Sequence, residues 1–346
     1  MKLKWNFLFN KDIILKLIYN PHFLGLCIFI SVLYFFWYPL NITYFASGGL
    51  IVLVLSYMFI QNKLNEYISS QKHILFYSKI VFGLSFLFWI LNGPLKMLQL
   101  RFHWFDLGSF AIPIVNFIYN GSFYNSFMEM PALADHFSPI LLFFVPLFKI
   151  YPSVLWLYWA KIFAHFVAVW LIFRFAQKNG LNDFYLSLLL LICVTNKYVC
   201  FALNFEFQPS SLALPFVVLA FQTMHYKQYK MMFLWLAILL LFKENMVFVW
   251  VSVGIYLLII EKKFVLGVML ILSGFCIGFL MSKFIMPSFN YGLLHHEGSI
   301  SLVEQIPAKI NSLFQIYILF GIVIILNPRL ILVSLPTLGL VLLGSN

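Results

Sequence analysis

Charged residues are scarce in this 346-residue chain. Only 10% of its residues are charged and 63% are hydrophobic, whereas soluble domains have about 25% charged and about 45–50% apolar residues. A water-soluble fold of this length has too little interior to hide so much apolar surface. We therefore predict an all-α protein that crosses the lipid bilayer many times, with the bilayer as the solvent for most of it.

Cysteine is also rare, and the motifs of several enzyme classes are missing. There is no glycine-rich phosphate loop and no nucleophile elbow, which argues against ATP-driven and serine-hydrolase chemistry. Residues 1–22 have no signal-peptide cleavage pattern, so we expect the first span to be an uncleaved anchor. Four cysteines lie in apolar stretches without metal-type spacing, and we interpret them as packing residues without disulfides: Cys27, Cys193, Cys200 and Cys276.

Apolar runs follow one another along the chain. A spanning helix needs about 20 mainly apolar residues. The run 138–150 is shorter, so we interpret it as re-entrant or interfacial. We assign 1–73 to an N-terminal cytoplasmic segment plus a two-span addition, and 74–346 to a transmembrane core. In total we predict about eleven spans, at residues 22–40, 41–61, 74–95, 153–175, 184–202, 210–226, 231–243, 245–260, 264–286, 311–327 and 330–344.

Lysine and arginine give an independent test of this topology, because they gather on the cytoplasmic side. The alternation of spans places these residues inside: Lys2, Lys4, Lys11, Lys16, Lys63, Lys72, Arg174, Lys178, Lys227, Lys230, Lys262, Lys263 and Arg329. The pattern predicts a multi-pass protein of the cell (inner) membrane with a cytoplasmic N-terminus. The net charge of +11 then faces anionic lipid, so we expect no nucleic acid partner.

The acidic residues lie mostly on the other side. Seven of the eleven fall outside: Asp106, Glu129, Asp135, Glu206, Glu244, Glu297 and Glu304. The longest outer loop, about 99–138, has apolar residues at helical spacing from Asp106 to Tyr119, then the turn signal Asn120-Gly121-Ser122. We expect a helix at the outer interface there, kinked at Pro113 and capped by Asp106.

Polar residues form four short clusters at the outer ends of the spans. They are Phe105-Asp106-Leu107-Gly108, Asp135-His136-Phe137-Ser138-Pro139, Asn204-Phe205-Glu206-Phe207-Gln208-Pro209 and Lys243-Glu244-Asn245. Each cluster places an ionisable group near hydrocarbon, which is unfavourable unless the group is paired or faces a wet cavity. The clusters therefore indicate a functional site on the extracytoplasmic face.

Each cluster also has a structural interpretation. Asp106 fits a helix cap, and Asp135-His136 fits a hydrogen-bonded pair within a loop. Glu206 fits a solvated loop residue. Lys243 fits a snorkelling lysine with Glu244 as its interfacial partner.

Several other ionisable residues lie outside these clusters. His295, His296 and Glu297 resemble a metal cluster by type, but adjacent histidines in a loop are more often solvated. His165 fits a core residue with its hydrogen bonds satisfied, whereas Lys161, one turn earlier, is harder to explain. A transport path is the alternative, lined by Lys161, His165, Lys243 and Glu244. The chain shows no inverted repeat of the kind that transporters carry.

Taken in order, the four clusters resemble an uncharacterised family of prokaryotic membrane proteins, domain of unknown function 2079. The similarity runs from about Trp104 to the end of the chain and includes Leu214-Pro215. Gln208 stands where the family usually has histidine, and Asn245 where it usually has aspartate, which weakens a metal or proton role there. Family members commonly continue further, so we expect that the sequence is truncated at Asn346 or lacks a C-terminal portion.

The family in turn looks like the GT-C group of membrane glycosyltransferases. That resemblance implies a GT-C-like core with a catalytic aspartate at the start of the interfacial helix, matched by Asp106. It implies a second acidic residue in another outer loop, matched by Glu206. It also implies a polyprenyl-phosphate-linked sugar as the donor.

An inverting sugar transfer needs a carboxylate that takes the proton of the acceptor, and we assign this role to Asp106. Asp135 and Glu206 would orient the acceptor or hold a divalent ion. Phosphate needs neutralisation of its charge as it leaves. We assign substrate and phosphate binding to Arg101, His136, Lys243 and Glu244.

The carboxylates allow a Mg²⁺ or Mn²⁺ site, although no spacing demands one. Its candidate ligands are Asp106, Asp135, His136 and Glu206. A secondary transporter and a non-catalytic GT-C-like scaffold or lipid-binding protein remain as alternatives. Convergence of the four clusters on one outward cavity favours the enzyme, a through-going polar path favours the transporter, and scattered local salt bridges favour the scaffold.

Overall fold

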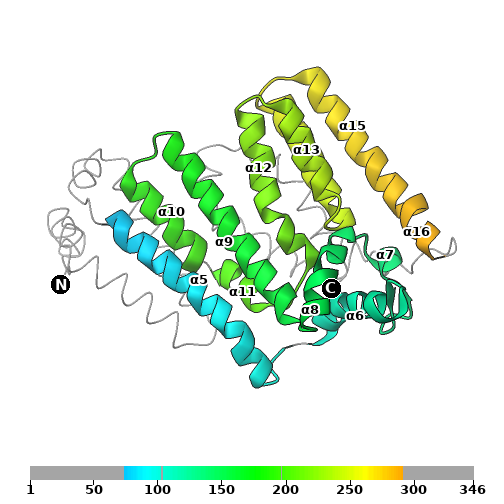
Figure 1. The fold of residues 1–346 in the computed structure, drawn as a ribbon. Helices are drawn as coiled ribbons and strands as arrows, with labels where there is room; N and C mark the ends of the chain where they lie inside the picture. The colour runs from blue at the N-terminus through cyan, green and yellow to red at the C-terminus, as the bar shows by residue number, and fades with distance from the viewer. Residues whose placement is uncertain (1–73, 103, 196, 291–346) are drawn as a thin grey trace, which may run out of the picture. The chain divides into compact units, whose positions relative to one another are not determined.

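The computed structural model describes residues 74–102, 104–195 and 197–290 (Figure 1). The described part is helical except for one hairpin of two short strands, β1 (Tyr124–Asn125) and β2 (Met130–Pro131). The predicted all-α membrane fold is confirmed at this level. The following predicted features lie outside the described residues: the N-terminal addition 1–73, the spans 22–40, 41–61, 311–327 and 330–344, and the cluster His295–Glu297.

Three helices of the described part are long and apolar enough to cross a bilayer. They are α5 (Ile74–Leu98), α9 (Leu155–Lys178), and α15 (Phe264–Leu280), which continues through η5 (Met281–Ile285) into α16 (Met286–Phe289). At about 1.5 Å per residue, each is longer than the hydrocarbon core of about 30 Å. They confirm the helices predicted at 74–95, 153–175 and 264–286.

The other predicted spans of the described part are shorter or interrupted. They are α10 (Asp183–Thr195) with α11 (Lys197–Asn204), η3 (Pro209–Ala213) with α12 (Leu214–His225), α13 (Tyr229–Leu239), and η4 (Glu244–Met246) with α14 (Val247–Ile259). Each helix has fewer than the about 20 residues of a span, so the number eleven stays a prediction. Proline at the first turn of η3 and α12 sets where these helices begin.

Three short elements and one longer helix connect α5 to α9. They are α6 (Trp104–Asn120), α7 (Ala132–Asp135), η2 (Pro139–Phe144) and α8 (Val145–Ile150). The apolar run 138–150 is thus short and divided, as its sequence indicates. Figure 1 shows α6 and α8 across the lower ends of the longer helices.

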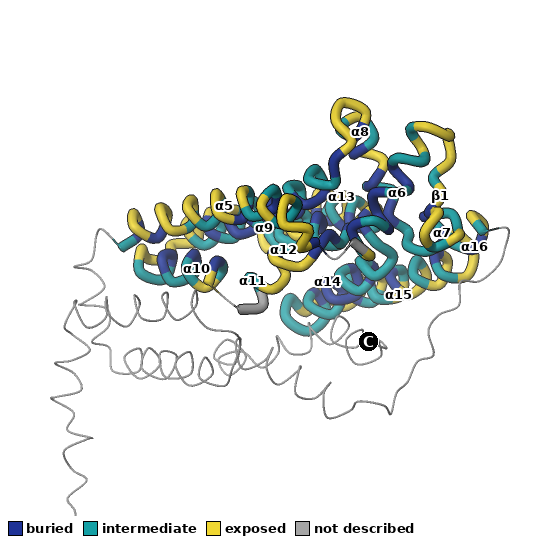
Figure 2. The backbone as a smooth tube through the Cα atoms, turned by 90° about the horizontal axis from the view of Figure 1, so that it is seen from below, coloured by how far each residue is buried: buried dark blue, intermediate teal, exposed yellow. Residues whose placement is uncertain are grey.

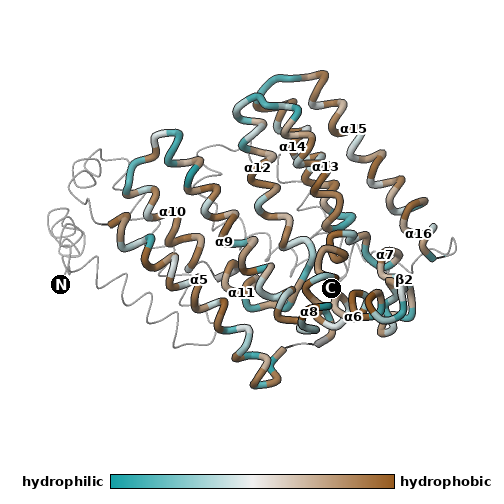
Figure 3. Tube along the Cα trace, in the orientation of Figure 1, coloured by the Kyte–Doolittle hydropathy of each residue, from teal (hydrophilic) through white to brown (hydrophobic). Residues whose placement is uncertain are grey.

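The longer helices pack in one series. α5, α9 and α10 contact one another, α9 contacts α12, α12 contacts α13, α13 contacts α14, and α14 contacts α15 (Figure 1). The loops that follow α9, α12 and α14 lie at the end opposite α6 and α7, and Figure 3 shows hydrophilic residues at both ends and hydrophobic helix bodies between them. The basic loops are therefore separated from the polar clusters by the length of the helices.

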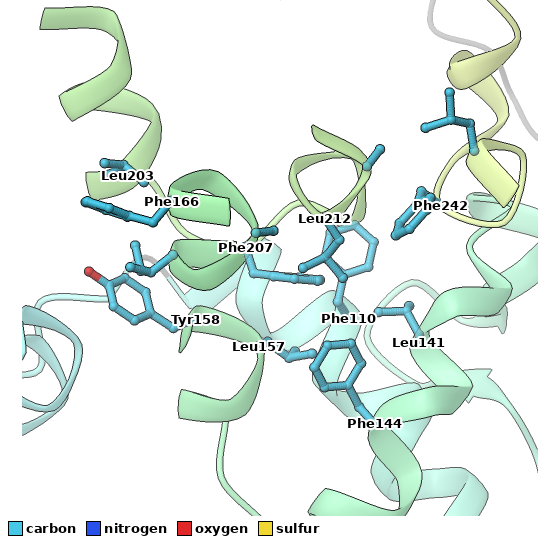
Figure 4. Packing of buried hydrophobic residues seen from close by; sticks show 14 of the residues in the cluster. Phe110, Leu141, Phe144, Leu157, Tyr158, Phe166, Leu203, Phe207, Leu212 and Phe242 are labelled. Atoms are coloured by element: carbon cyan, nitrogen blue, oxygen red, sulfur yellow. The ribbon is translucent and has the colours of Figure 1, made fainter. Parts of the chain in front are cut away.

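One hydrophobic core connects α6 to the longer helices. Leu107, Leu157, Tyr158 and Phe207 are each 0% exposed and belong to the same cluster, part of which is drawn in Figure 4. Within lipid, such side chains stabilise the fold through van der Waals packing between the helices. Because Leu107 follows Asp106, this core also holds the first cluster in place.

The outer faces of the helices remain apolar. Figure 2 shows exposed residues along α5 and α15, with buried residues on their inner sides. Leu84, Phe88, Met269 and Phe275 are examples of exposed large hydrophobic residues on these two helices. Contiguous exposed apolar surface of this kind marks a membrane-facing region.

Helices α14 and α15 approach each other closely through glycine. A Cβ atom at Gly267 would lie 2.8 Å from the backbone oxygen of Gly254 and 2.8 Å from the Cβ of Leu258. A Cβ atom at Gly254 would lie 3.0 Å from the backbone oxygen of Gly267. Small residues allow this close backbone packing between membrane helices.

We expect Gly267→Ala to lower the free energy of unfolding by about 1–3 kcal/mol, the usual cost of overpacking, because backbone atoms must move apart. Gly83→Ala is the control, since a Cβ there meets nothing within 4 Å. Thermal unfolding of both variants in the same detergent checks this. Equal melting temperatures for the two variants would show that the glycine contact is not needed.

Candidate functional site

Asp106 lies in the first turn of α6, which matches the helix that the apolar spacing from Asp106 to Tyr119 predicts. The helix begins at Trp104, so Asp106 is inside it and is not its cap. Phe105 is 59% exposed and Leu107 is 0% exposed, so Asp106 stands at the edge between surface and core. A carboxylate in a first turn is also stabilised by the helix dipole. The helix continues through Pro113.

A small hairpin fixes the loop after α6. The predicted turn at Asn120-Gly121-Ser122 is present, and Gly121 has a φ of 67°, a conformation that favours glycine. Asn125, 1% exposed, donates a hydrogen bond of 3.1 Å to the Ser109 carbonyl and accepts one from the backbone N–H of Phe127. The hairpin is thereby attached to α6 one turn after Asp106.

A cavity of about 630 Å³ lies among the end of α5, the start of α6, the end of α11 and the segment that follows α11. Three predicted site residues line it: Arg101, Asp106 and Glu206. Asn204 and Phe205, which belong to the third cluster, also line it. The sequence pattern did not single out the remaining lining residues, which are Asn92, Lys96, Gln99 and Phe201. A basic residue in the last turn of a helix is the signal that could have found Lys96.

Glu206 is buried beside this cavity. Its side chain is 2% exposed, so the interpretation of Glu206 as a solvated loop residue is wrong. The carboxylate interacts electrostatically with Lys96 and Lys161 and with Asp106. The predicted second acidic residue therefore lies close to the first.

Direct contacts join the second, third and fourth clusters. His136 Nδ1 lies 3.1 Å from Glu244 Oε1, and the backbone N–H of Phe137 donates to Glu244 Oε2 at 3.0 Å. Lys243 Nζ lies 3.5 Å from Gln208 Oε1. These contacts join the second cluster to the fourth and the fourth to the third, although the clusters are far apart in sequence.

Asp106 interacts with members of all three other clusters. It forms a hydrogen bond with the Gln208 side chain and interacts electrostatically with Glu206, Lys243 and His136. The structure thus brings the four clusters together at one end of the helices. Arg101 lies on the cavity side of Asp106, whereas the His136–Glu244 pair and Lys243 do not line the cavity.

The two key carboxyls have pKa values shifted in opposite directions. Burial raises the pKa of Asp106, and the charge of Glu206 raises it further. Lys243, His136 and Gln208 act to lower this pKa, but the net shift is upward. Burial also acts to raise the pKa of Glu244. The hydrogen bond and charge of His136 lower it, as do a backbone hydrogen bond and the charge of Lys243. The net pKa of Glu244 lies below its ordinary value. Carboxyls with pKa values pushed apart are typical of acid–base sites.

Asp135 is the last residue of α7 and half-buried. Its role and its predicted part in metal binding stay predictions. Within the described ranges, no group of three or more His, Cys, Asp or Glu side chains is arranged to hold a metal ion.

We expect Glu244→Gln to destabilise the protein by about 1.5–3 kcal/mol near neutral pH, because a hydrogen bond to a charged group is lost. The pKa of Glu244 is lowered on folding, so its stabilisation is complete above the ordinary value of 4.5 and disappears as pH falls through the lower, folded value. Melting temperatures of wild type, Glu244→Gln and the control Glu261→Gln between pH 3.5 and 7 check this. A difference that persists unchanged at the acid end would contradict the pairing.

Comparisons with known proteins agree with the pattern of the four clusters. A family described as "Predicted membrane protein (DUF2079)" matches residues 96–346, a range that contains all four clusters. No curated protein and no solved structure matches the chain. Because this match covers most of the sequence, the chain belongs to the DUF2079 family of predicted membrane proteins.

Proposed function

We propose that this protein is an inverting membrane glycosyltransferase of GT-C type. It moves a sugar from a polyprenyl-phosphate donor to an acceptor on the extracytoplasmic side. The observation that carries the proposal is one cavity in which Asp106, a carboxyl with a raised pKa, lies with the cations Lys96 and Arg101. The proposed base Asp106 and the proposed anion-binding pair Lys96 and Arg101 thus line the same cavity.

Asp106 acts as the general base. In the transfer, a bond forms between the acceptor oxygen and the anomeric carbon while the bond from that carbon to the phosphate oxygen breaks. Asp106 takes the acceptor proton, and the phosphate leaves with the electron pair of its bond. A carboxyl whose pKa is raised toward neutral pH is a better base than an ordinary one, which is what burial and Glu206 provide.

The cations neutralise the leaving phosphate. Arg101 is exposed at the cavity, and Lys96 is half-buried in the last turn of α5. Arginine in particular matches phosphate with two parallel hydrogen bonds. Lys243 and His136, which do not line the cavity, add positive charge near Asp106. Glu244 orients His136 through their contact of 3.1 Å.

The predicted orientation supports a site outside the cytoplasm. Lys178 is the last residue of α9, and Lys227, Lys262 and Lys263 belong to the loops at the same end, away from α6 (Figure 1). If these loops face the cytoplasm, as basic loops do, the cavity opens on the extracytoplasmic side. That is where lipid-linked sugars of this class would be used.

The transporter alternative receives less support. It requires Lys161 and His165 to line a polar path, but the Lys161 ammonium donates to backbone carbonyls, among them Leu203 at 2.9 Å. His165 Nε2 is shielded from the surface, which does not favour an open path past it. A scaffold would not need the four clusters to converge as they do.

We expect Asp106→Asn to lower transfer by about 10²–10⁴-fold, the usual contribution of a positioned general base. Comparative mass spectrometry of lipids and surface glycans in a deletion strain carrying wild type, Asp106→Asn or the control Asp183→Asn measures this. The Asp106→Asn strain should match the deletion strain, and the control should match wild type. An unchanged glycome in the deletion strain, or full activity of folded Asp106→Asn, would sink the proposal.

The ionisation of Asp106 should respond to its neighbours with opposite signs. Glu206→Gln removes a negative charge and should lower the Asp106 pKa, whereas Lys243→Gln removes a positive charge and should raise it. Infrared titration of the protonated carboxyl band, taken as the difference from an Asp106→Asn background, measures this pKa. Two shifts of the same sign would show that these charges do not act on Asp106.

A further inference from the structure

Lys161 is an ionisable residue that the proposed mechanism does not use. It lies in α9, a helix long enough to span the bilayer, and its side chain is 3% exposed. An ammonium group buried in such a place is unfavourable unless it is paired or well hydrogen-bonded. Its partners therefore indicate what it does.

The partners of Lys161 are backbone carbonyls from one short segment. Its Nζ donates to the carbonyls of Leu203 at 2.9 Å and Glu206 at 3.0 Å, and also to Phe205. Ala202 accepts a longer contact of 3.4 Å. The ammonium also lies 4.7 Å from the ring centroid of Tyr158, a cation–π distance.

These carbonyls need an outside donor because α11 ends at Asn204. The last four carbonyls of a helix have no partner within the helix, and a lysine side chain is one way to satisfy them. Lys96 donates to the Asn204 carbonyl. Two lysines, one from α5 and one from α9, therefore hold the carbonyls of five consecutive residues, 202–206.

This segment carries Glu206 into the candidate site. Glu206 interacts electrostatically with both lysines and with Asp106. Leu203 and Phe207, on either side of Glu206, belong to the core that also contains Tyr158 (Figure 4). The segment is thus fixed by apolar packing at its ends and by the two lysines between them.

We propose that Lys161 is a positioning residue of the site, which holds the segment 202–206 in the conformation that presents Glu206 to Asp106. This rests on the proposed function only in taking Glu206 as a site residue. Lysine suits the role because its ammonium has three N–H donors that it can direct at several carbonyls. A methionine of similar length has none.

The test is hydrogen–deuterium exchange of the full chain in lipid nanodiscs, followed by mass spectrometry. We expect the amides of 202–208 to exchange about tenfold to a hundredfold faster in Lys161→Met, as hydrogen bonds to a charged donor are lost. Exchange in α12 should stay unchanged. The matched control is Lys178→Met, on the same helix, where the ammonium lies 4.5 Å from the Tyr226 ring centroid.

A second variant separates positioning from general stability. In Lys161→Ala, added propylammonium should restore protection of 202–208, whereas tetramethylammonium, which has no N–H donor, should not. The rescue of Lys161→Ala also tests the positioning role if Lys161→Met fails to fold. Unchanged exchange in Lys161→Met, uniformly faster exchange along the whole chain, or rescue by tetramethylammonium would overturn the proposal.

The exchange experiment needs no sugar donor, so its outcome is independent of the glycan measurement. A local effect at 202–208 together with an unchanged glycome would leave Lys161 in its structural role and remove the transferase. The reverse pair of results would leave the transferase and remove the positioning role.

Discussion

Backbone hydrogen bonding in a low-dielectric environment is the constraint on which the site depends. Within lipid, polar backbone groups must find their partners inside the protein, and helix interiors do this by themselves. Helix ends cannot, because their terminal groups have no intrahelical partner. The candidate site lies where α5 and α11 end and where α6 and η4 begin.

The same requirement explains the charges at these ends. Lys96 and Lys161 satisfy carbonyls at the end of α11 and directly after it, and Glu206 interacts electrostatically with both lysines. The carboxylate that balances the lysines also acts on Asp106, whose pKa it raises. The residue that meets the structural need for paired charge would therefore also strengthen Asp106 as the base of the proposed transfer.

The sequence predicted more about the site than about the number of spans. Members of the four clusters interact with Asp106 or with one another, because each cluster lies at a helix end. Only the first and third clusters line the cavity, and the side of the membrane on which they lie stays a prediction. The partner Lys96 was missed, since a lone lysine at the end of an apolar run resembles a snorkelling residue. Glu206 could be interpreted as a solvated loop residue because a short polar sequence shows neither the burial of a side chain nor its neighbours in the fold.

The helix lengths were less predictable than the helices themselves. The run 210–226 has the composition of one apolar span, yet it forms the 3-10 helix η3 and then the α-helix α12. Hydropathy averages over such a break, and a short helix that packs on its neighbours has the same composition as a span. The contact between α14 and α15 through Gly254 and Gly267 could likewise be found only from the fold.

The most direct test of the central claim is a cryo-electron microscopy structure with a bound donor analogue. The protein would be reconstituted in nanodiscs with a non-hydrolysable polyprenyl-phosphonate sugar. Our account predicts the phosphonate within hydrogen-bond distance of Arg101 and Lys96, and the sugar facing the Asp106 carboxylate. A ligand bound elsewhere on the helices, with this cavity lacking density for the analogue, would contradict it.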